Sequence, residues 1–303
     1  MEVELIRQKK FGKTFSIAII VAYFIVVIYS GLNLGNKALS DMIISWIQPT
    51  VFIVTAIVLF NEDAISFKQG LFINKFKPKY LLIAVVAFLG LFFGFGYINA
   101  VLGEGMVKAG LISLADIKME SFNDYVLYVI GTAVAPAIGE EVLFRGVILY
   151  GLYRYSVQDG VKADGASELK IALAIGLCFS VFHKNPAQLL YQFACGTTFA
   201  LITLKSGSIF PAMLMHFLNN FTILTFTFFA PGFNPLGLIQ TVIGLVVFLV
   251  VFVVLIKDGK FVEEDCKNFT LKGFFSKAWY GLAFCGVIMV VNIISTLLNT
   301  YFF

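Results

Sequence analysis

The sequence predicts an all-α fold, a polytopic bundle of about eight or nine transmembrane helices. Of the 303 residues, 59% are hydrophobic and only 13% are charged, whereas a soluble domain is nearer half apolar and about a quarter charged. A soluble chain with so few charges could not cover its own surface. The mean hydropathy is +0.91, and apolar runs long enough to cross a bilayer recur along the whole chain.

Nine apolar runs are candidates for these helices, because about 20 helical residues cross a hydrocarbon core of about 30 Å. They lie at 14–34, 42–60, 80–102, 125–153, 169–184, 187–204, 208–231, 235–256 and 279–302. The fifth run is short and Pro186 ends it, so the count becomes eight if the fifth and sixth runs form one tight helical pair. No long polar linker divides the chain, and we expect a single integral membrane domain over residues 1–303.

Basic residues set the expected orientation. Lysine and arginine cluster at 7–13, 68–79, 154–170 and 257–277, and the intervening connections carry fewer of them. All four clusters fall on one side of the bundle, and the positive-inside rule makes that side, with the N-terminus, cytoplasmic. Lysine outnumbers arginine and phenylalanine is abundant at 34 residues, which favours an AT-rich bacterial genome. We therefore expect a protein of the bacterial cell membrane.

One cluster of charges lies inside an apolar run. Glu140, Glu141 and Arg145 fall within the fourth run, where a charge at mid-bilayer costs about 2.5–3.5 kcal/mol. Glu141 and Arg145 are four residues apart, so they share a helix face and can form an ion pair. Glu140 points about 100° away and has no cation of its own in the helix. An ion pair that holds helices together would explain Glu141 and Arg145, but not Glu140, which suits a general base or acid.

The residues around this cluster predict close helix packing. Pro136 lies one turn before Glu140, removes one helical hydrogen bond and frees the carbonyl of Thr132. Small side chains from Gly131 to Gly139 allow neighbouring helices to approach. We therefore expect this stretch to lie against another helix of the bundle.

Both histidines of the chain also lie near membrane depth. His183 ends the fifth run, and His216 sits in the seventh run with Asn220 one helical turn later. A lone intramembrane histidine commonly forms a hydrogen bond within the bundle, but two histidines beside a glutamate pair favour a site. Counted from the cytoplasmic ends, Glu140, His183 and His216 lie about 10–20 Å along their helices at 1.5 Å per residue. We expect them at one site, open toward the cytoplasmic half of the bilayer.

Three motifs in order resemble the CAAX prenyl protease and bacteriocin-processing (CPBP, or Abi) family. EEVLFR at 140–145 is similar to the family motif EExxxR, FSVFH at 179–183 to FxxxH, and HFLNN at 216–220 to HxxxN. The resemblance covers about 125–231, which we take as the catalytic core. It implies a fold of about eight transmembrane helices and a glutamate-dependent intramembrane endopeptidase that needs no metal and no cofactor.

The resemblance also implies residue roles. Glu140 with His183 would activate the attacking water, and His216 with Asn220 would stabilise the oxyanion. Glu141 and Arg145 would organise the site. The partners implied are a peptide or membrane-protein substrate, the lipid bilayer and, as a further option, a membrane regulatory partner; nucleic acid is not expected.

Three alternatives remain at the level of the sequence. Glu140, His183 and His216 would make a His₂Glu zinc set, although no HExxH motif is present. A transporter could use the acidic pair as a proton relay, although no inverted repeat is visible. A non-catalytic member of the family could act by binding, as a membrane regulator of a sensor kinase or in bacteriocin immunity.

Overall fold

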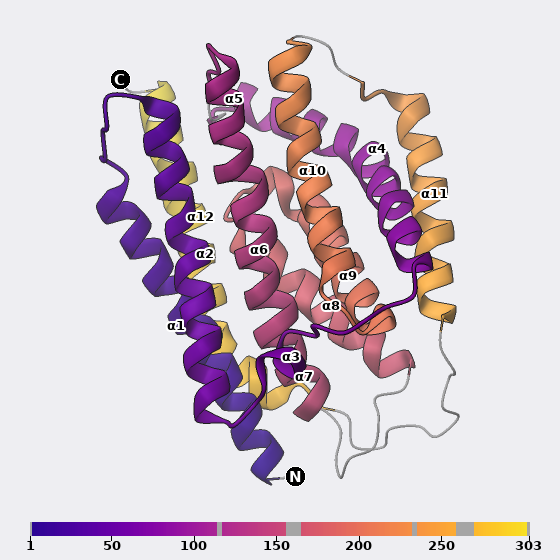
Figure 1. Ribbon diagram of the computed structural model, residues 1–303. Coiled ribbons are helices and arrows are strands. Elements are labelled where there is room, and N and C mark those ends of the chain that lie inside the picture. The colour runs from indigo at the N-terminus through magenta and orange to yellow at the C-terminus, as the bar shows by residue number, and fades with distance from the viewer. Residues whose placement is uncertain (1, 114–116, 156–164, 232–234, 259–269, 302–303) are drawn as a thin grey trace.

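The described chain is helical. A computed structural model describes residues 2–113, 117–155, 165–231, 235–258 and 270–301, and no strand occurs among them (Figure 1). The elements are α1 Glu2–Tyr29, α2 Lys37–Glu62, α3 Phe67–Gly70, α4 Lys79–Lys108, α5 Phe122–Tyr128, η1 Val129–Val134, α6 Ala135–Glu141, η2 Val142–Ile148, α7 Leu149–Tyr155, α8 Gly165–Phe182, η3 Pro186–Gln188, α9 Leu189–Ser206, α10 Phe210–Phe229, α11 Leu238–Lys257 and α12 Lys272–Tyr301. The predicted all-α helical bundle is confirmed.

Eight helical segments of the described chain are long and apolar enough to cross a membrane. The predicted limits differ most at the first span, which was expected at 14–34. Helix α1 instead starts at Glu2 and ends at Tyr29, so the basic residues at 7–13 belong to the helix. Lysine and arginine are good helix formers. A search for apolar runs alone therefore misses the helical turns that these basic residues add before the run.

Helix α8 is absent from these eight and pairs with α9 instead. The two helices are joined by a short connection that includes η3, and they pack closely along their lengths. A Cβ atom on Gly176 of α8 would lie 2.1 Å from Oγ1 of Thr197 on α9, so only glycine permits this approach. The hairpin turn places His183 at the end of α8. The expected tight pair of the fifth and sixth runs is therefore present.

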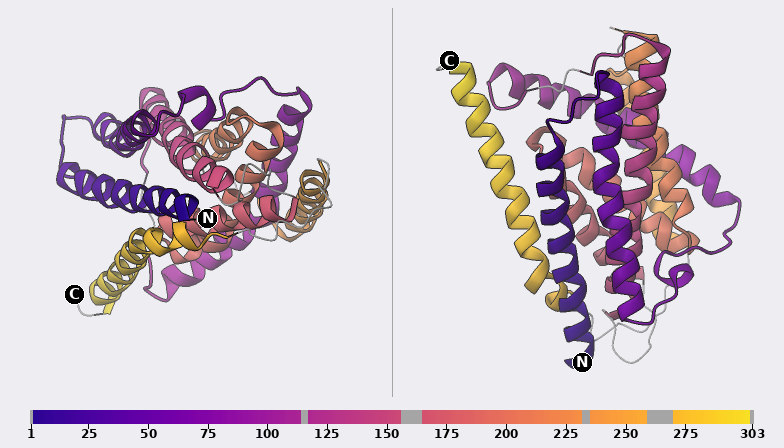
Figure 2. Two further views of the ribbon diagram at one scale, coloured as in Figure 1. Left: turned by 90° about the horizontal axis from the view of Figure 1, so that it is seen from below. Right: turned by 60° about the vertical axis from the view of Figure 1, so that its left-hand side comes forward.

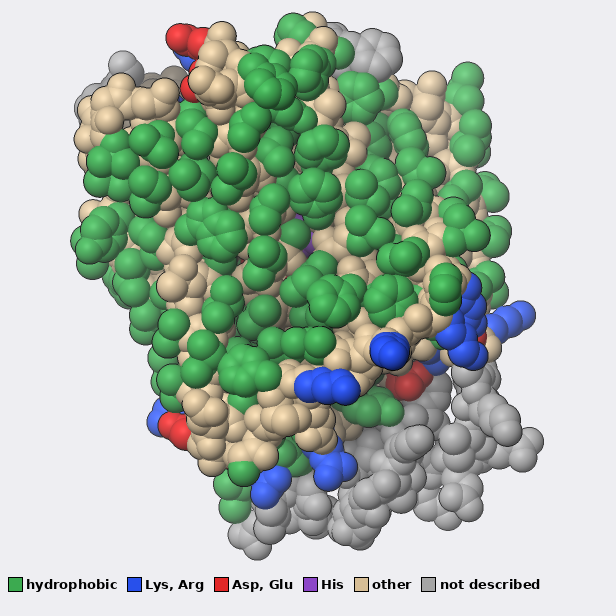
Figure 3. Space-filling view, viewed as in Figure 1, with side chains coloured by type: hydrophobic (Ala, Val, Ile, Leu, Met, Phe, Trp, Pro, Cys, Tyr) green, Lys and Arg blue, Asp and Glu red, His purple; other side chains and the backbone are tan. Residues whose placement is uncertain are grey.

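The two ends of the bundle differ in charge. The N-terminus, α3, the end of α7 and the start of α12 lie at the lower end in Figure 1, and the C-terminus lies at the upper end. Figure 3 shows lysine and arginine side chains gathered at that lower end, below a broad band of hydrophobic side chains. Residues 156–164 and 259–269, which belong to two of the basic clusters, lie outside the described residues.

The segment from α5 to α7 lies between α2 and α10 (Figures 1 and 2). Gly139 of α6 faces Pro49 of α2 so closely that a Cβ atom there would lie 2.3 Å from Cα of Pro49. Likewise, a Cβ atom on Gly131 of η1 would lie 2.9 Å from Cα of Met42 on α2. The small residues of this stretch thus allow the close packing that the sequence predicts, and they bring α2 next to Glu140.

The orientation can be tested with single cysteines in a cysteine-free variant. Lys75 and Lys37 are exposed at opposite ends of the bundle. With the N-terminus cytoplasmic, Lys75→Cys should react with an impermeant thiol reagent only in inverted vesicles, and Lys37→Cys only in intact cells, because basic connections are retained inside. The reverse labelling pattern would overturn the orientation.

Candidate active site

Two π-helical segments flank the acidic pair. Helix α6 ends with Glu140 and Glu141, η1 precedes it, and η2 follows it and contains Arg145. π-Turns are rare and often occur at functional sites. Pro136, near the start of α6, was expected to interrupt the helix. The sequence did not reveal the π-helical turns, which form within an otherwise continuous helical span.

Glu141 lies at the centre of the buried polar cluster. Its Oε1 atom accepts hydrogen bonds from Nη1 of Arg145 at 3.0 Å and from Nδ1 of His216 at 2.8 Å. The side chains of Glu141 and Arg145 are both 0% exposed. The ion pair expected from their spacing is therefore present, and it reaches a third residue on α10.

Arg145 joins the cluster to α8 and α9. Its Nη2 atom donates to the carbonyl oxygen of Gly196 at 3.2 Å. The guanidinium carbon lies 4.6 Å from the ring centroid of Phe179 and 5.0 Å from that of Phe199. A cation over aromatic faces is attracted by their quadrupoles, and the attraction is larger away from water. This one side chain therefore contacts three separate helical elements.

The contact with Glu141 determines the hydrogen-bonding roles of the two ring nitrogens of His216. The Oε1 atom of Glu141 already accepts from the guanidinium of Arg145, so the Nδ1 atom of His216 is the donor in its contact with that oxygen. The Nε2 atom has no partner among the described residues, and the ring lines a cavity. In the imidazolium form both ring nitrogens donate, and Nε2 is then a donor available to a ligand.

Glu140 is held from another side. Its Oε1 atom accepts a hydrogen bond from Nε2 of Gln48 on α2 at 3.2 Å. Its Oε2 atom is buried and has no hydrogen-bond partner in the part of the chain that the structure describes. A buried carboxylate oxygen normally has a partner, such as a water molecule, and Glu140 lines the same cavity as His216. The free oxygen is therefore suited to bind water.

A backbone carbonyl fixes the tautomer of His183. The Nδ1 atom of His183 lies 2.7 Å from the carbonyl oxygen of Phe179. A carbonyl can only accept, so Nδ1 carries the proton and Nε2 of the neutral ring is an acceptor. That acceptor is the group that a base needs to take a proton from water.

A chain of hydrogen bonds orients Asn220. The hydroxyl of Tyr191 donates to Oδ1 of Asn219, Nδ2 of Asn219 donates to Oδ1 of Asn220 at 2.9 Å, and Nδ2 of Asn220 donates to the carbonyl of Thr132 at 3.0 Å. Each link defines the direction of the next amide. The last acceptor, the carbonyl of Thr132, lies in the π-helical turn η1, and the second amide hydrogen of Asn220 has no partner among the described residues.

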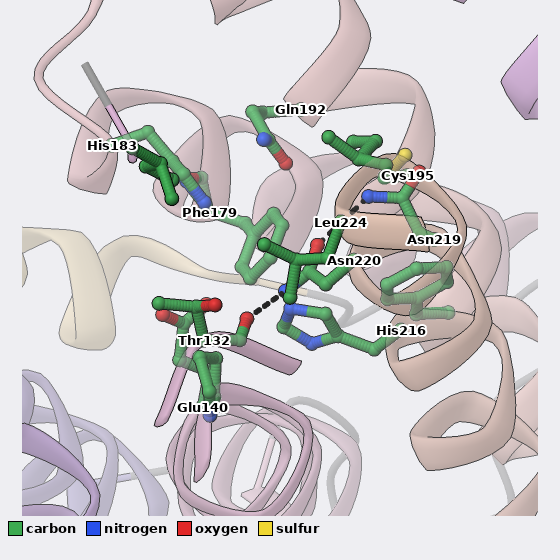
Figure 4. Close-up of a pocket in the computed structure, with 14 residues that line it drawn as sticks. Thr132, Glu140, Phe179, His183, Gln192, Cys195, His216, Asn219, Asn220 and Leu224 are labelled. Atoms are coloured by element: carbon green, nitrogen blue, oxygen red, sulfur yellow. Dashed lines mark hydrogen bonds between the residues drawn. The ribbon is translucent and has the colours of Figure 1, made fainter. Parts of the chain in front are cut away.

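These side chains line one cavity of about 250 Å³, which is large enough for several water molecules. Figure 4 shows Glu140, His183, His216 and Asn220 around it, contributed by α6, the end of α8 and α10. Glu141 and Arg145 lie behind this surface and do not line the cavity. The structure thus brings together the four residues predicted for catalysis and places the two predicted organising residues next to them.

Three contributors were missed at the level of the sequence: Gln48, Tyr191 and Asn219. Gln48 precedes Pro49 in a long apolar run, and an isolated amide in such a run is a signal for an intramembrane hydrogen bond. Asn219 is adjacent to the motif residue Asn220. Tyr191 carries no such signal, because an aromatic residue in a transmembrane helix is ordinary.

The expected opening toward the cytoplasmic half stays a prediction, on which the exposed residues at the border of the cavity bear. Ile117, 37% exposed, and Ile223, 48% exposed, border the cavity. Ile117 lies between the end of α4 and the start of α5, at the end opposite the N-terminus. Figure 3 also shows a histidine within the apolar band, seen between α6 and α10. Counting residues from the helix ends located the side chains along their helices. It could not place the connection between α4 and α5 that borders the cavity.

The ligand set of the zinc alternative is not assembled. Among the described residues, no three His, Cys, Asp or Glu side chains are grouped so that they could hold a metal ion.

Comparison with known proteins gave one match. A family model described as type II CAAX prenyl endopeptidase Rce1-like matches residues 122–222, about a third of the 303 residues. No curated protein and no solved structure matched. The matched segment begins at α5 and ends within α10, and it contains all six residues singled out from the three motifs.

The buried ion pair predicts a difference in stability between two variants. Arg145→Ala should unfold at a clearly lower temperature in detergent than Glu140→Gln, since removing one partner of a buried pair leaves an uncompensated charge on Glu141 and costs about 3–5 kcal/mol. Glu140→Gln only replaces an oxygen beside Gln48. Equal unfolding temperatures for Arg145→Ala and the wild type would show that Arg145 does not compensate a buried charge on Glu141.

Proposed function

Because this chain belongs to the CAAX protease family through residues 122–222, we propose that it is an intramembrane endopeptidase whose attacking water is activated by Glu140 and His183. The observation that carries the proposal is the free acceptor pair in the cavity. Oε2 of Glu140 has no partner, and Nε2 of His183 is left as an acceptor by the bond from Nδ1 to the carbonyl of Phe179. Both residues line the space in which water would bind.

In the first step, water bound at Glu140 attacks the carbonyl carbon of the peptide bond. As the new C–O bond forms, the water gives a proton to the Glu140 carboxylate or to Nε2 of His183. The carboxylate is held by Gln48 at its other oxygen, so it is fixed before the reaction rather than during it. The acquired proton is then available for the leaving nitrogen.

The developing oxyanion is stabilised by His216 and Asn220. His216 carries a proton toward the cavity in its imidazolium form, and Glu141 accepts from the opposite ring nitrogen. Asn220 keeps one amide hydrogen free while the other is bonded to Thr132. Fixed donors in a site with little water stabilise a developing negative charge more strongly than the same groups do in water.

The surroundings of the site point to substrates at or in the membrane. The site lies within helices of the eight candidate spans, apart from His183 at the end of α8. Exposed Ile117 and Ile223 border the cavity, and Ile117 belongs to the connection between α4 and α5, at the end opposite the N-terminus. With the N-terminus cytoplasmic in a bacterial cell membrane, that border faces outward, and a peptide or a membrane protein would reach it from that side or laterally between α6 and α10.

The role of the acceptor pair is tested by substitution. In phosphatidylcholine proteoliposomes supplied with a library of internally quenched peptides, Glu140→Gln and His183→Ala should each lower the cleavage rate by at least about 100-fold, the range of general base catalysis. Both variants should insert and purify as the wild type does.

Glu104→Gln is the matched control for the loss of a carboxylate, because Glu104 pairs only with Lys108 on the exposed end of α4. It should cleave the library as the wild type does. Cleavage by Glu140→Gln or His183→Ala at the control rate would remove the proposed catalytic role of that residue.

A further inference from the structure

A second cavity adjoins the candidate active site. It has a volume of about 450 Å³ and is bordered by the α8–α9 turn, the connection after α4 and the C-terminal half of α12. His183 borders both this cavity and the candidate active site. A polypeptide that crosses the catalytic cavity past His183 would therefore enter the second cavity. We call this second space the α12 cavity.

Lys184 supplies the only charged side chain that lines the α12 cavity among the described residues. Its Nζ atom donates to the carbonyl oxygen of Phe182 at 2.8 Å and lies 4.8 Å from the ring centroid of the same residue. No carboxylate of the described chain is within ion-pair distance of it. An ammonium group has three hydrogens to donate, so two remain for a ligand.

The backbone at Lys184 adds a second observation. Its φ angle is +53°, in the left-handed region that follows many helices and usually holds glycine. A lysine there strains the backbone, and strained residues concentrate at functional sites. The position directly after His183 thus carries a cation where local structure alone would favour glycine.

Helix α12 presents a polar stripe to the same cavity. Asn292, Ser295, Thr296 and Asn299 line it, at the i, i+3, i+4 and i+7 spacing of one helix face. Neither side-chain amide, Asn292 or Asn299, has a hydrogen bond within the described chain, whereas Thr296 bonds back to the carbonyl of Asn292. Both amides are exposed, so they can donate to and accept from a polar ligand that enters the α12 cavity.

Figure 2 shows why the stripe is accessible. Helix α12 leans away from α1 toward its C-terminus, while its last residues, Thr300 and Tyr301, lie against Gly110 after α4. The opposite side of the helix carries exposed Val287, Val291 and Ile294, which suit lipid. The polar stripe and Lys184 therefore face one another across a space with hydrogen-bond donors and no acid.

We propose that Lys184 and the polar stripe of α12 bind a carboxylate of the peptide substrate, so that the protein selects peptides with an acidic group on one side of the cleaved bond. An ammonium with amide and hydroxyl donors is complementary to a carboxylate. The shared border at His183 favours a peptide as its source, either an acidic side chain or a free C-terminus. The proposal rests on the proposed peptidase function.

The test compares matched peptides in phosphatidylcholine proteoliposomes. Internally quenched decapeptides carry Glu or Gln at each position in turn with an amidated C-terminus, and a second set differs only in a free or amidated C-terminus. The wild type should cleave one acidic member with a kcat/KM at least about tenfold above its neutral partner, the discrimination expected of a charged hydrogen bond. The set in which the preference appears identifies the source of the carboxylate.

Variants assign that preference to Lys184. Lys184→Gln should bring the acidic-to-neutral ratio near one, Lys184→Arg should keep it, and Lys184→Glu should favour peptides with Lys at the same position. Lys37→Gln is the matched control, since Lys37 is 71% exposed and pairs with Asp41, and it should keep the wild-type ratio. An unchanged ratio in Lys184→Gln, or no preference in the wild type, overturns the inference.

A binding measurement separates this inference from the proposed function. Fluorescence anisotropy of labelled peptides on Glu140→Gln should give tighter binding of the acidic member, and Lys184→Gln in the same background should abolish the difference. If the wild type cleaves nothing but this difference is present, the peptidase proposal fails and the carboxylate site stands. If Lys184→Gln instead loses a co-purifying anionic phospholipid in native mass spectrometry and peptide preference is unaffected, the ligand is a lipid phosphate and the inference fails.

Discussion

The Glu141 carboxylate is the interaction on which the rest of the site depends. One of its oxygens accepts from Arg145 of η2 and from His216 of α10, and Arg145 in turn bonds to the backbone of α9. Removing two charges from water costs several kcal/mol per ion, which good geometry and further hydrogen bonds must offset. A pair this deeply buried is therefore a weak source of net stability. It restricts instead how α6, η2, α9 and α10 can pack, and thereby fixes the direction of the His216 ring.

Close backbone contacts make that arrangement accessible. Gly139 allows α2 to approach α6, and Gly176 allows α8 and α9 to form the hairpin that ends near His183. The cavity thus combines groups whose orientation is set by partners outside it. Gln48 holds Glu140, a backbone carbonyl holds His183, and a chain from Tyr191 holds Asn220. Such fixed orientation is what a hydrolytic site needs, because the groups do not have to reorganise during the reaction.

Much of this could be predicted from the sequence, for identifiable reasons. Charge inside an apolar run is costly, so Glu140, Glu141 and Arg145 were conspicuous, and the four-residue spacing gave the Glu141–Arg145 pair. Helical periodicity could not give the π-turns on either side of α6, which change the spacing within one span. It also could not give contacts between distant runs, such as Gln48 with Glu140. The sequence also could not show that Ile117, in the connection between α4 and α5, borders the cavity, because helical patterns place helices and not the connections between them.

The central claim is that Glu141 couples to His216 across two helices. A double-mutant cycle with Glu141→Gln and His216→Gln, followed by denaturant unfolding in one detergent, measures that coupling directly. Contacting residues typically give an interaction energy of about 0.5–3 kcal/mol, and a buried charged contact belongs in the upper part of that range. The account predicts that the double variant is destabilised by clearly less than the sum of the two single variants. Additivity within about 0.5 kcal/mol would contradict it.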